Sequence, residues 1–329
     1  MVVLHMTTNK VTKELISVII PNWNGAKHIV TCLESVVQSS YRTLEIIVVD
    51  NGSTDESIAL ITKNFPDVKI LKFNSNNGFS VAINVGIKES QGEFIFLLNN
   101  DMKLDPNCIE RLCSSLCNRP NCSMATGKVI RFDQTDHIDS AGDSITTSCA
   151  PFNRGHLHKD SGQYNNEELI FGGCAGATLY RRELFSQIGT FDETFFAYME
   201  DVDFNCRALL TGHNTVYIPG AITYHHGNAT FGTFSFAHVF YTNRNTLFVL
   251  LKNYRLRWII RYFMEIFRHQ LKMAYLFSTT ERGWSFLRSR LSAILKVPYI
   301  LLKRHAFLRK FAPDWNSLFS FMEKNNYPD

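Results

Sequence analysis

The feature that most constrains the fold of this chain is a regular alternation of short apolar runs and helical patterns over its first hundred residues. The apolar runs are rich in β-branched residues and almost uninterrupted, which is typical of parallel strands covered on both faces. The predicted strands are Ile16–Pro21, Leu44–Val49, Val68–Phe73 and Phe94–Leu98. Helical spacing of apolar residues predicts helices from Ile29 to about Ser39, from the turn after Asp50 to Phe65, and over Phe79–Glu89. This order predicts an α/β fold with a doubly wound, parallel sheet.

Polar residues collect where these predicted strands end. They are Asn22 and Asn24 after the first strand, Asp50 after the second, and Asn99, Asn100 and Asp101 after the fourth. Ligands of open parallel sheets bind at the carboxyl ends of the strands, so we expect these side chains to share one crevice. No Gly-x-Gly-x-x-Gly follows the first strand, which argues against a dinucleotide site. Asp101 alone fits either a ligand of Mg²⁺ or Mn²⁺ or an ordinary turn residue.

The strongly aromatic segment Tyr198–Phe204 contains three carboxylates in a stretch of four residues. They are Glu200, Asp201 and Asp203. Mutual repulsion and apolar surroundings should raise the pKa of at least one of them into the range of a general base. The competing interpretation is a solvated acidic helix start, favoured by the helix dipole.

His225 and His226 follow another predicted strand, Val216–Ile218. An imidazole at this place could complete a metal shell begun by Asp101, because neutral imidazole is a common metal ligand. A structural histidine is an equally good interpretation of this position alone.

Together these segments resemble the family two inverting glycosyltransferases of GT-A fold, in their rhamnosyltransferase-like branch. The resemblance runs from about Ile16 to Gly232, and its segments keep the family's order and spacing. The segments that carry it are Val18–Gly25, Val48–Asp55, Asn76–Phe79, Leu97–Asp101, Gly173–Ala177, Gly189–Glu193, Phe196–Asp203 and Pro219–His226. It implies a GT-A sheet that is mixed but mainly parallel, flanked by helices and followed by a C-terminal helical extension.

The resemblance implies a donor site on the first half of the chain. The nucleotide would be bound by residues at the strand ends and in the following turns, with Asp50 at the base: Pro21, Asn24, Asp50, Asn77 and Asn100. Asp101 and His225 would hold Mg²⁺ or Mn²⁺ together with the donor's diphosphate, with His226 as the second choice for the imidazole. Asn99 departs from the family's acidic triplet, and Phe79–Asn84 departs from its small, glycine-rich helix start.

The resemblance also implies the reaction. Asp201 would deprotonate the acceptor hydroxyl, Glu200 would place the acceptor, and Gly176 and Ala177 would leave room for the acceptor and the donor sugar. The branch favours dTDP-rhamnose as donor, and UDP-hexoses share its motifs. The acceptor would be a saccharide or a polyprenyl-linked saccharide in cell-surface polysaccharide assembly. Two alternatives remain at this point: a nucleotidyltransferase, and an inactive sugar-nucleotide-binding protein.

The predicted organisation is a catalytic domain over residues 1–232 and a basic, amphipathic helical extension over 233–329. Within the first, about 15–101 would bind the nucleotide and 102–232 the acceptor. The extension should form two or three helices between Ser235 and about Leu308, and its mixture of basic and apolar residues suits an anionic membrane surface. The formal net charge of +4 is too small to indicate nucleic acid as a partner.

Because the extension suits a membrane surface, we expect a cytoplasmic protein that is peripheral on the inner face of the cell membrane. Residues 120–170 are interpreted as a solvated loop over the acceptor cleft.

Overall fold

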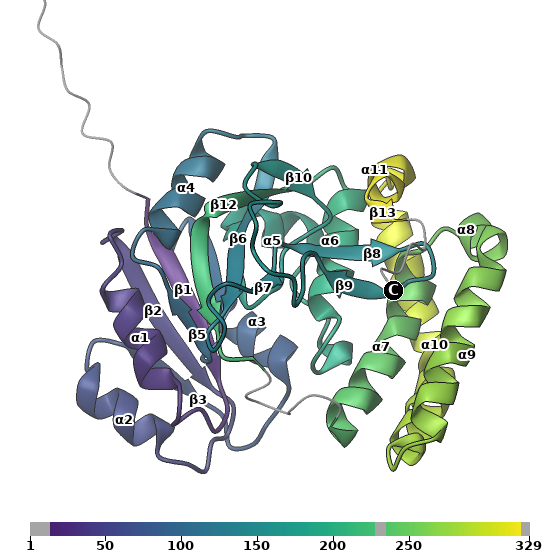
Figure 1. Ribbon diagram of the computed structural model, residues 1–329, viewed down its shortest axis with the longest axis horizontal. Coiled ribbons are helices and arrows are strands. Elements are labelled where there is room, and N and C mark those ends of the chain that lie inside the picture. The colour runs from purple at the N-terminus through teal and green to yellow at the C-terminus, as the bar shows by residue number, and fades with distance from the viewer. Residues whose placement is uncertain (1–13, 228–234, 324–329) are drawn as a thin grey trace, which may run out of the picture.

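The structure, a computed structural model, describes residues 14–227 and 235–323. Its centre is one large twisted sheet with helices on both faces (Figure 1). Along the sheet the strands run in the order β10-β12-β6-β11-β4-β1-β2-β3. Their bounds are β1 Ile16–Asn22, β2 Leu44–Asp50, β3 Lys69–Lys72, β4 Phe94–Leu98, β6 Cys122–Arg131, β10 Glu168–Ile170, β11 Ala177–Arg181 and β12 Asn214–His225.

The first four strands form the parallel half of the sheet. β1 pairs in parallel with β2 and with β4, and β2 pairs in parallel with β3. The helices that cover this half are α1 (Ile29–Val37), α2 (Ser57–Asn64) and α3 (Phe79–Glu89). Along β1, Val18 and Ile20 belong to the core under α1 and α2, and Ile19 to the core under α3. The predicted strands and helices of this half are confirmed.

The second half of the sheet makes it mixed. β11 is antiparallel to both β4 and β6, whereas the long β12 runs parallel to β6. The short β5 (Met102–Leu104) follows Asp101 directly and pairs antiparallel with the end of β12, with Met102 opposite His225. This register brings the end of β12 beside Asp101. The remaining helices here are α4 (Cys108–Cys117), α5 (Arg182–Ile188), the short 3₁₀ helix η1 (Glu193–Phe195) and α6 (Glu200–Leu210).

Residues 120–170 are not a solvated loop, so that interpretation is wrong. They contain β6 and β10 of the main sheet, and β7 (Ile138–Ser140), which pairs with β6. β8 (Asp143–Thr146) and β9 (Pro151–Asn153) pair with each other, and β8 also pairs with β13 (Met322–Glu323) near the C-terminus. These strands are short and owe their place to pairing with distant segments, which leaves little periodicity in the sequence.

Residues 235–323 are mainly helical and lie at one end of the molecule (Figure 1). They form α7 (Phe236–Asn253), α8 (Leu256–Arg261), α9 (Phe263–Ser278), α10 (Gly283–Lys310) and α11 (Trp315–Ser320). The prediction of two or three helices before Leu308 is wrong, since α7 to α10 all begin in that range. Phe248 and Val249 of α7 share one buried cluster with Val202 and Leu209 of α6, so this region packs directly on the helix that carries Asp201.

Candidate active site

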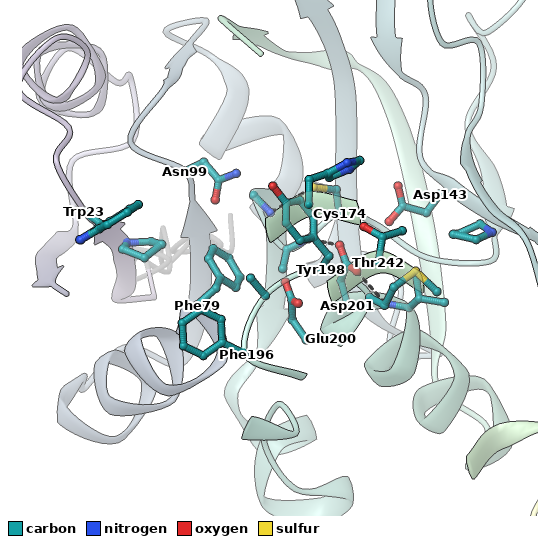
Figure 2. A pocket seen from close by; sticks show the side chains of 18 of the residues that line it. Trp23, Phe79, Asn99, Asp143, Cys174, Phe196, Tyr198, Glu200, Asp201 and Thr242 are labelled. Atoms are coloured by element: carbon teal, nitrogen blue, oxygen red, sulfur yellow. Dashed lines mark hydrogen bonds between the residues drawn. The ribbon is translucent and has the colours of Figure 1, made fainter. Parts of the chain in front are cut away.

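A cavity of about 450 Å³ opens between the parallel half of the sheet and the start of α6 (Figure 2). One side is lined by residues that follow the parallel strands: Pro21, Asn22, Trp23, Asn51, Asn76, Phe79, Asn99 and Asn100. The other side is lined by residues of β8 to β9, the segment before α6, and α7: Asp143, Pro151, Phe152, Asn153, Tyr198, Met199, His238 and Thr242. Glu200 and Asp201 lie between the two sides (Figure 2).

Polar side chains on the strand side are joined by hydrogen bonds. Asn100 Nδ2 donates to Asn22 Oδ1 (2.9 Å), and Asn22 Nδ2 donates to Asp50 Oδ1 (3.1 Å). Asp50 also accepts from the backbone N–H of Ser53 at 3.2 Å. Asp50 is buried behind Asn22 and does not line the cavity, whereas Pro21 and Asn100 do. The predicted convergence of the strand ends is thus present, with Asp50 in a supporting position.

Asn24 and Asn77, also assigned to the nucleotide, are exposed and not among the cavity's lining residues. Asn24 Oδ1 accepts from the Thr54 backbone N–H at 2.8 Å. The Asn77 backbone N–H donates to Asn51 Oδ1 (2.8 Å), so Asn51, a lining residue that the sequence did not single out, holds this turn.

Asp101 and His225 lie together, as predicted. His225 Nε2 is 3.3 Å from Asp101 Oδ2, and the other oxygen, Asp101 Oδ1, is buried and has no hydrogen-bond partner among the residues that the structure describes. Burial opposes ionisation of Asp101, but the hydrogen bond and charge of His225 hold its pKa below the usual range. Burial likewise lowers the pKa of His225, but the carboxylates of Asp101 and Asp139 outweigh it and raise this pKa to about 10.

His226, the second choice, faces elsewhere. Its ring stacks on Phe132, with 3.7 Å between the centroids, and only its backbone N–H reaches the carbonyl of Asp101 (3.1 Å). The structure therefore separates the two neighbouring histidines and gives the side-chain contact with Asp101 to His225.

A divalent cation fits the donor atoms at Asp101 and His225. Asp101 Oδ1 is buried without a hydrogen-bond partner among the described residues, and the imidazole of His225 contacts Oδ2 of the same carboxylate; carboxylate oxygens and imidazole nitrogens both serve as ligands of divalent cations. Within the described ranges no three His, Cys, Asp or Glu side chains gather as a metal site. A cation here would take further ligands from a bound diphosphate. Asn99 adds an amide and no charge at this edge.

The turn before α6 presents the proposed base. Phe196, Tyr198 and Met199 have positive φ angles of 68°, 67° and 69°, which non-glycine residues adopt only when their surroundings hold them. Asn245 of α7 supplies that support, because its Nδ2 lies 2.7–2.9 Å from the carbonyl oxygens of Phe195, Ala197 and Tyr198.

Asp201 is half-buried, and backbone N–H groups hold its carboxylate at the cavity. Val202 N–H donates to Oδ1 (2.8 Å) and Ala175 N–H to Oδ2 (3.4 Å). Burial raises the pKa of Asp201. Glu200 is buried, its Oε2 has no hydrogen-bond partner among the described residues, and burial together with the charge of Asp201 raises its pKa well above the usual value. The direction of both shifts is the one predicted for this cluster.

Asp203, the third carboxylate, serves the packing. It accepts from Arg207 Nε (3.0 Å), Lys252 Nζ (2.9 Å) and Asn253 Nδ2 (2.8 Å). Burial opposes its ionisation, but the charges of Lys252 and Arg207 lower its pKa.

Gly176 and Ala177 differ in their relation to the cavity. Gly176 lines it, and a Cβ at this position would lie 2.6 Å from Asn99 Nδ2. Ala177 is buried in β11 and is not a lining residue.

The sequence interpretation missed two acidic residues. Asp143 of β8 lines the cavity, is buried, and has a pKa raised well above the usual value by burial and the charge of Asp201. Asp139 of β7 contacts His225, with 2.7 Å between Oδ2 and Nδ1. Both belong to an acidic stretch whose irregular spacing gives no indication of which members point inward.

Comparison with known proteins identifies the family of the chain. Residues 17–189, more than half of the chain, match the profile of "Glycosyl transferase family 2". The chain is 25% identical over 313 residues to the N-acetylglucosaminyl-diphospho-decaprenol L-rhamnosyltransferase of Mycobacterium tuberculosis, covering 84% of this chain and 99% of that protein. It is 32% identical over 126 residues to glycosyltransferase GlyG of Streptococcus pneumoniae, covering 37% of this chain and 42% of GlyG.

Two solved structures share the fold. GalNAc-T7 with UDP, GalNAc and Mn²⁺ superposes with a TM-score of 0.58 at 15% identity, over 73% of this chain and 48% of that one. S. aureus TarS 1-349 superposes with a TM-score of 0.54 at 16% identity, over 93% of this chain and 89% of TarS. The predicted GT-A fold is thereby confirmed. With its sequence profile, its rhamnosyltransferase-like relative and its GT-A sheet, the chain belongs to glycosyl transferase family 2.

Proposed function

We propose that this glycosyltransferase moves a sugar from a dTDP- or UDP-linked donor to a saccharide hydroxyl, with the help of a divalent cation and with inversion at the anomeric carbon. The observation that carries the proposal is the arrangement around one cavity. Asp201, a carboxylate of raised pKa, lines it together with the strand-end amides and Asp143, and the Asp101–His225 pair comes directly after the lining residue Asn100 without itself lining the cavity. Family membership favours sugar transfer over nucleotidyl transfer.

The strand side of the cavity is the proposed donor site. Asn22 and Asn100 line it; Asp50 holds Asn22, and Asn22 holds Asn100, so the nucleoside would meet amide groups already fixed in place. Asp101 and His225 would hold Mg²⁺ or Mn²⁺ against the diphosphate. When bound, such a cation neutralises the charge that develops on the departing diphosphate.

Asp201 is the proposed general base. Its carboxylate accepts from two backbone N–H groups and so has lone pairs left for the proton of an acceptor hydroxyl. A raised pKa brings this carboxylate closer to the ideal value for a base near neutral pH. Glu200, which lines the cavity beside Asp201, would place the acceptor. A single base at the reacting hydroxyl fits direct displacement, and hence inversion.

For the substrates we propose rhamnose as the transferred sugar and a polyprenyl-diphosphate-linked saccharide as acceptor. The support is the similarity to the mycobacterial N-acetylglucosaminyl-diphospho-decaprenol L-rhamnosyltransferase, which this chain covers almost end to end. The setting would be assembly of a cell-surface polysaccharide.

A transfer assay tests this function. The protein would be incubated with Mn²⁺, labelled dTDP-rhamnose or a UDP-hexose, and N-acetylglucosaminyl diphosphate on a short isoprenoid. We expect labelled lipid-linked product, and a loss of about 10²- to 10⁴-fold in kcat for Asp201→Asn with donor binding unchanged. Asp203→Asn is not a suitable control because Asp203 is buried in an ion network, so Asp136→Asn, at an exposed side chain, is used. Equal rates for Asp201→Asn and wild type would contradict the assignment of the base.

We also propose an anionic membrane surface as a partner of helices α8 to α10. Most of the exposed large apolar side chains of the described residues lie here: Leu256, Ile260, Phe263, Met264, Phe267, Leu271, Tyr275, Leu276, Trp284, Leu287, Leu291, Ile294, Leu295, Tyr299, Leu301 and Leu302. Exposed apolar surface of this extent on a folded protein indicates an interaction site. In the part of the chain that the structure describes, no helix is long and apolar enough to cross a bilayer.

The charge of this surface selects anionic lipid as the occupant. The exposed charged side chains between Arg255 and Lys310 are Arg257, Arg261, Arg268, Lys272, Arg288, Arg309 and Lys310, against Glu281 alone. Apolar side chains mixed with exposed basic ones are typical of helices that lie in the interface of anionic membranes. A protein bound to the cytoplasmic leaflet would encounter a lipid-linked acceptor by diffusion within the plane of the membrane.

Vesicle sedimentation tests the membrane surface. Wild-type protein should sediment with phosphatidylglycerol vesicles and remain free with phosphatidylcholine vesicles. The double variant Leu291→Glu, Leu295→Glu changes two exposed side chains and should abolish sedimentation without unfolding the protein. Val37→Glu, an exposed apolar position on α1 at the other end of the molecule, is the matched control and should behave as wild type (Figure 1). Equal sedimentation of the double variant, or wild-type dimers that disappear in it, would contradict the lipid assignment.

A further inference from the structure

His225 is held between two carboxylates that come from different parts of the chain. Asp101 follows β4 and faces Nε2, and Asp139 in β7 faces Nδ1. The Nδ1–Oδ2 distance to Asp139 is 2.7 Å and the Nε2–Oδ2 distance to Asp101 is 3.3 Å. The contact with Asp139 is therefore the tighter of the two, although neither the metal shell nor the proposed reaction requires it directly.

The sheet fixes this contact through two strand pairings. β6 pairs with β12 so that Arg131 lies opposite His225, and on its other side β6 pairs with β7, with Ile130 opposite Ile138. Asp139 is thus brought to the imidazole by backbone hydrogen bonds across two neighbouring strands. His156 supports the far side of Asp139, with its Nδ1 3.0 Å from the Asp139 carbonyl oxygen.

The chemistry of imidazole gives this contact a consequence for the opposite nitrogen. A ring that donates its Nδ1 hydrogen to a carboxylate has its tautomer and its orientation fixed, and Nε2 then carries the lone pair for a metal. Here Nε2 faces Asp101, whose second oxygen is buried without a hydrogen-bond partner in the described part of the chain. The imidazole of His225 therefore lies between the carboxylates of Asp139 and Asp101.

We propose that Asp139 is a positioning residue, which fixes the ring of His225 so that Nε2 and Asp101 bind one divalent cation. The proposal rests on the proposed function, because it assigns a residue to the cation site of the donor. Asp139 itself touches neither substrate nor cation. A purely structural ion pair between Asp139 and His225 is the competing explanation, and it predicts effects on stability without effects on metal affinity.

The test is the affinity for Mn²⁺ in the presence of UDP or dTDP, measured from the electron paramagnetic resonance signal of free Mn²⁺. We expect Asp139→Ala to weaken the Kd for Mn²⁺ by about 10- to 100-fold, as for other partners of metal-bound histidines. Asp139→Asn keeps an acceptor for the Nδ1 hydrogen but loses the charge, so we expect about a tenfold loss. His225→Ala, which removes the ligand, should have the weakest affinity of the series.

The matched control is Asp136→Asn, which removes an exposed carboxylate three residues before Asp139 that contacts His137 and Lys159, and it should keep the wild-type Kd. An unchanged Kd in Asp139→Asn, or in a folded Asp139→Ala, would overturn the proposal while leaving the metal dependence intact. If Asp139→Ala does not fold, the Asn variant decides. Failure of the wild-type protein to bind Mn²⁺ with either nucleotide would instead overturn the metal-dependent part of the proposed function, and this inference with it.

Discussion

A buried ion network joins the helical C-terminal region to the proposed catalytic helix, and breaking it is the sharpest test of how the two depend on each other. Lys252 near the end of α7 lies between two carboxylates, with Nζ 2.7 Å from Asp192 Oδ2 and 2.9 Å from Asp203 Oδ2. Its side chain is 6% exposed. Asp203 belongs to α6 and Asp192 precedes η1, so Lys252 links α7 to both segments that frame Glu200 and Asp201.

The expected loss of stability depends on which cationic partners Asp192 and Asp203 retain after the substitution. Removing one partner of a buried ion pair costs about 3–5 kcal/mol, because the other charge is left buried and uncompensated. After Lys252→Met, Asp192 retains Lys303 and Asp203 retains Arg207, so we expect the lower end, about 3 kcal/mol. With about 2.1 cal/mol/K of unfolding entropy per residue, this lowers the Tm of a chain of this length by about 4 °C.

Differential scanning fluorimetry of Lys252→Met and Lys303→Met measures this. Lys303 contacts one carboxylate, Asp192, and the hydroxyl of Thr194, and its side chain is 29% exposed, so its loss should cost about 1 kcal/mol, or about 1.5 °C. Both substitutions keep the aliphatic stem. A Tm for Lys252→Met within 1 °C of the wild-type value, or above that of Lys303→Met, would refute the reasoning from burial and shared charge.

Three further outcomes are expected. Burial raises the pKa of Asp201, which must be ionised to act as base, so kcat should fall on the acid side with a midpoint above about 3.9, the usual value for Asp. A midpoint at or below that value contradicts the role. Asn99→Asp adds a negative charge near the cation site and should tighten Mn²⁺ binding by about 1 kcal/mol, or about fivefold, in a calorimetric titration. Weaker binding by this variant would contradict the prediction and show that the Asn99 amide supports Mn²⁺ binding. Burial opposes ionisation of Asp192, but Lys252 and Lys303 hold its pKa well below the usual range. The contribution of Asp192 to the free energy of unfolding is therefore present above about pH 4 and is lost on acidification. A Tm that is equal at pH 7 and pH 3 would contradict this.

The parallel half of the fold could be predicted closely because each strand there is a continuous β-branched run. α3 and β4 have the predicted bounds, and β1 and β2 extend one residue further than predicted. The antiparallel half was mostly missed. β7 and β8 are three and four residues long and depend on pairing with β6, β9 and β13, and such pairing is not written in local periodicity.

The dependence on distant strand pairing also decides which site residues could be predicted from the sequence. Asp101 and Asp201 stood out because each follows a strong pattern, a buried strand in one case and an aromatic, acidic helix start in the other. The positions of Asp139 and Asp143 could not be predicted from local patterns. Asp139, for example, reaches His225 only through the register of β6 with β7 and β12. The breaks between α7, α8 and α9 fall at Tyr254 and Tyr262, where neither proline nor glycine marks a helix end.

The most direct test of the central claim, a nucleotide-sugar site built around Asp101, is thermal denaturation of the protein with dTDP or UDP, each with and without Mn²⁺. At a ligand concentration of about 100 Kd the stabilisation is about 2.7 kcal/mol, or about 4 °C for a chain of this length. The account predicts such a rise in Tm with at least one nucleotide, only when Mn²⁺ is present, and its loss in Asp101→Ala. A folded wild-type protein whose Tm responds to neither nucleotide, or an equal response in Asp101→Ala, would contradict it.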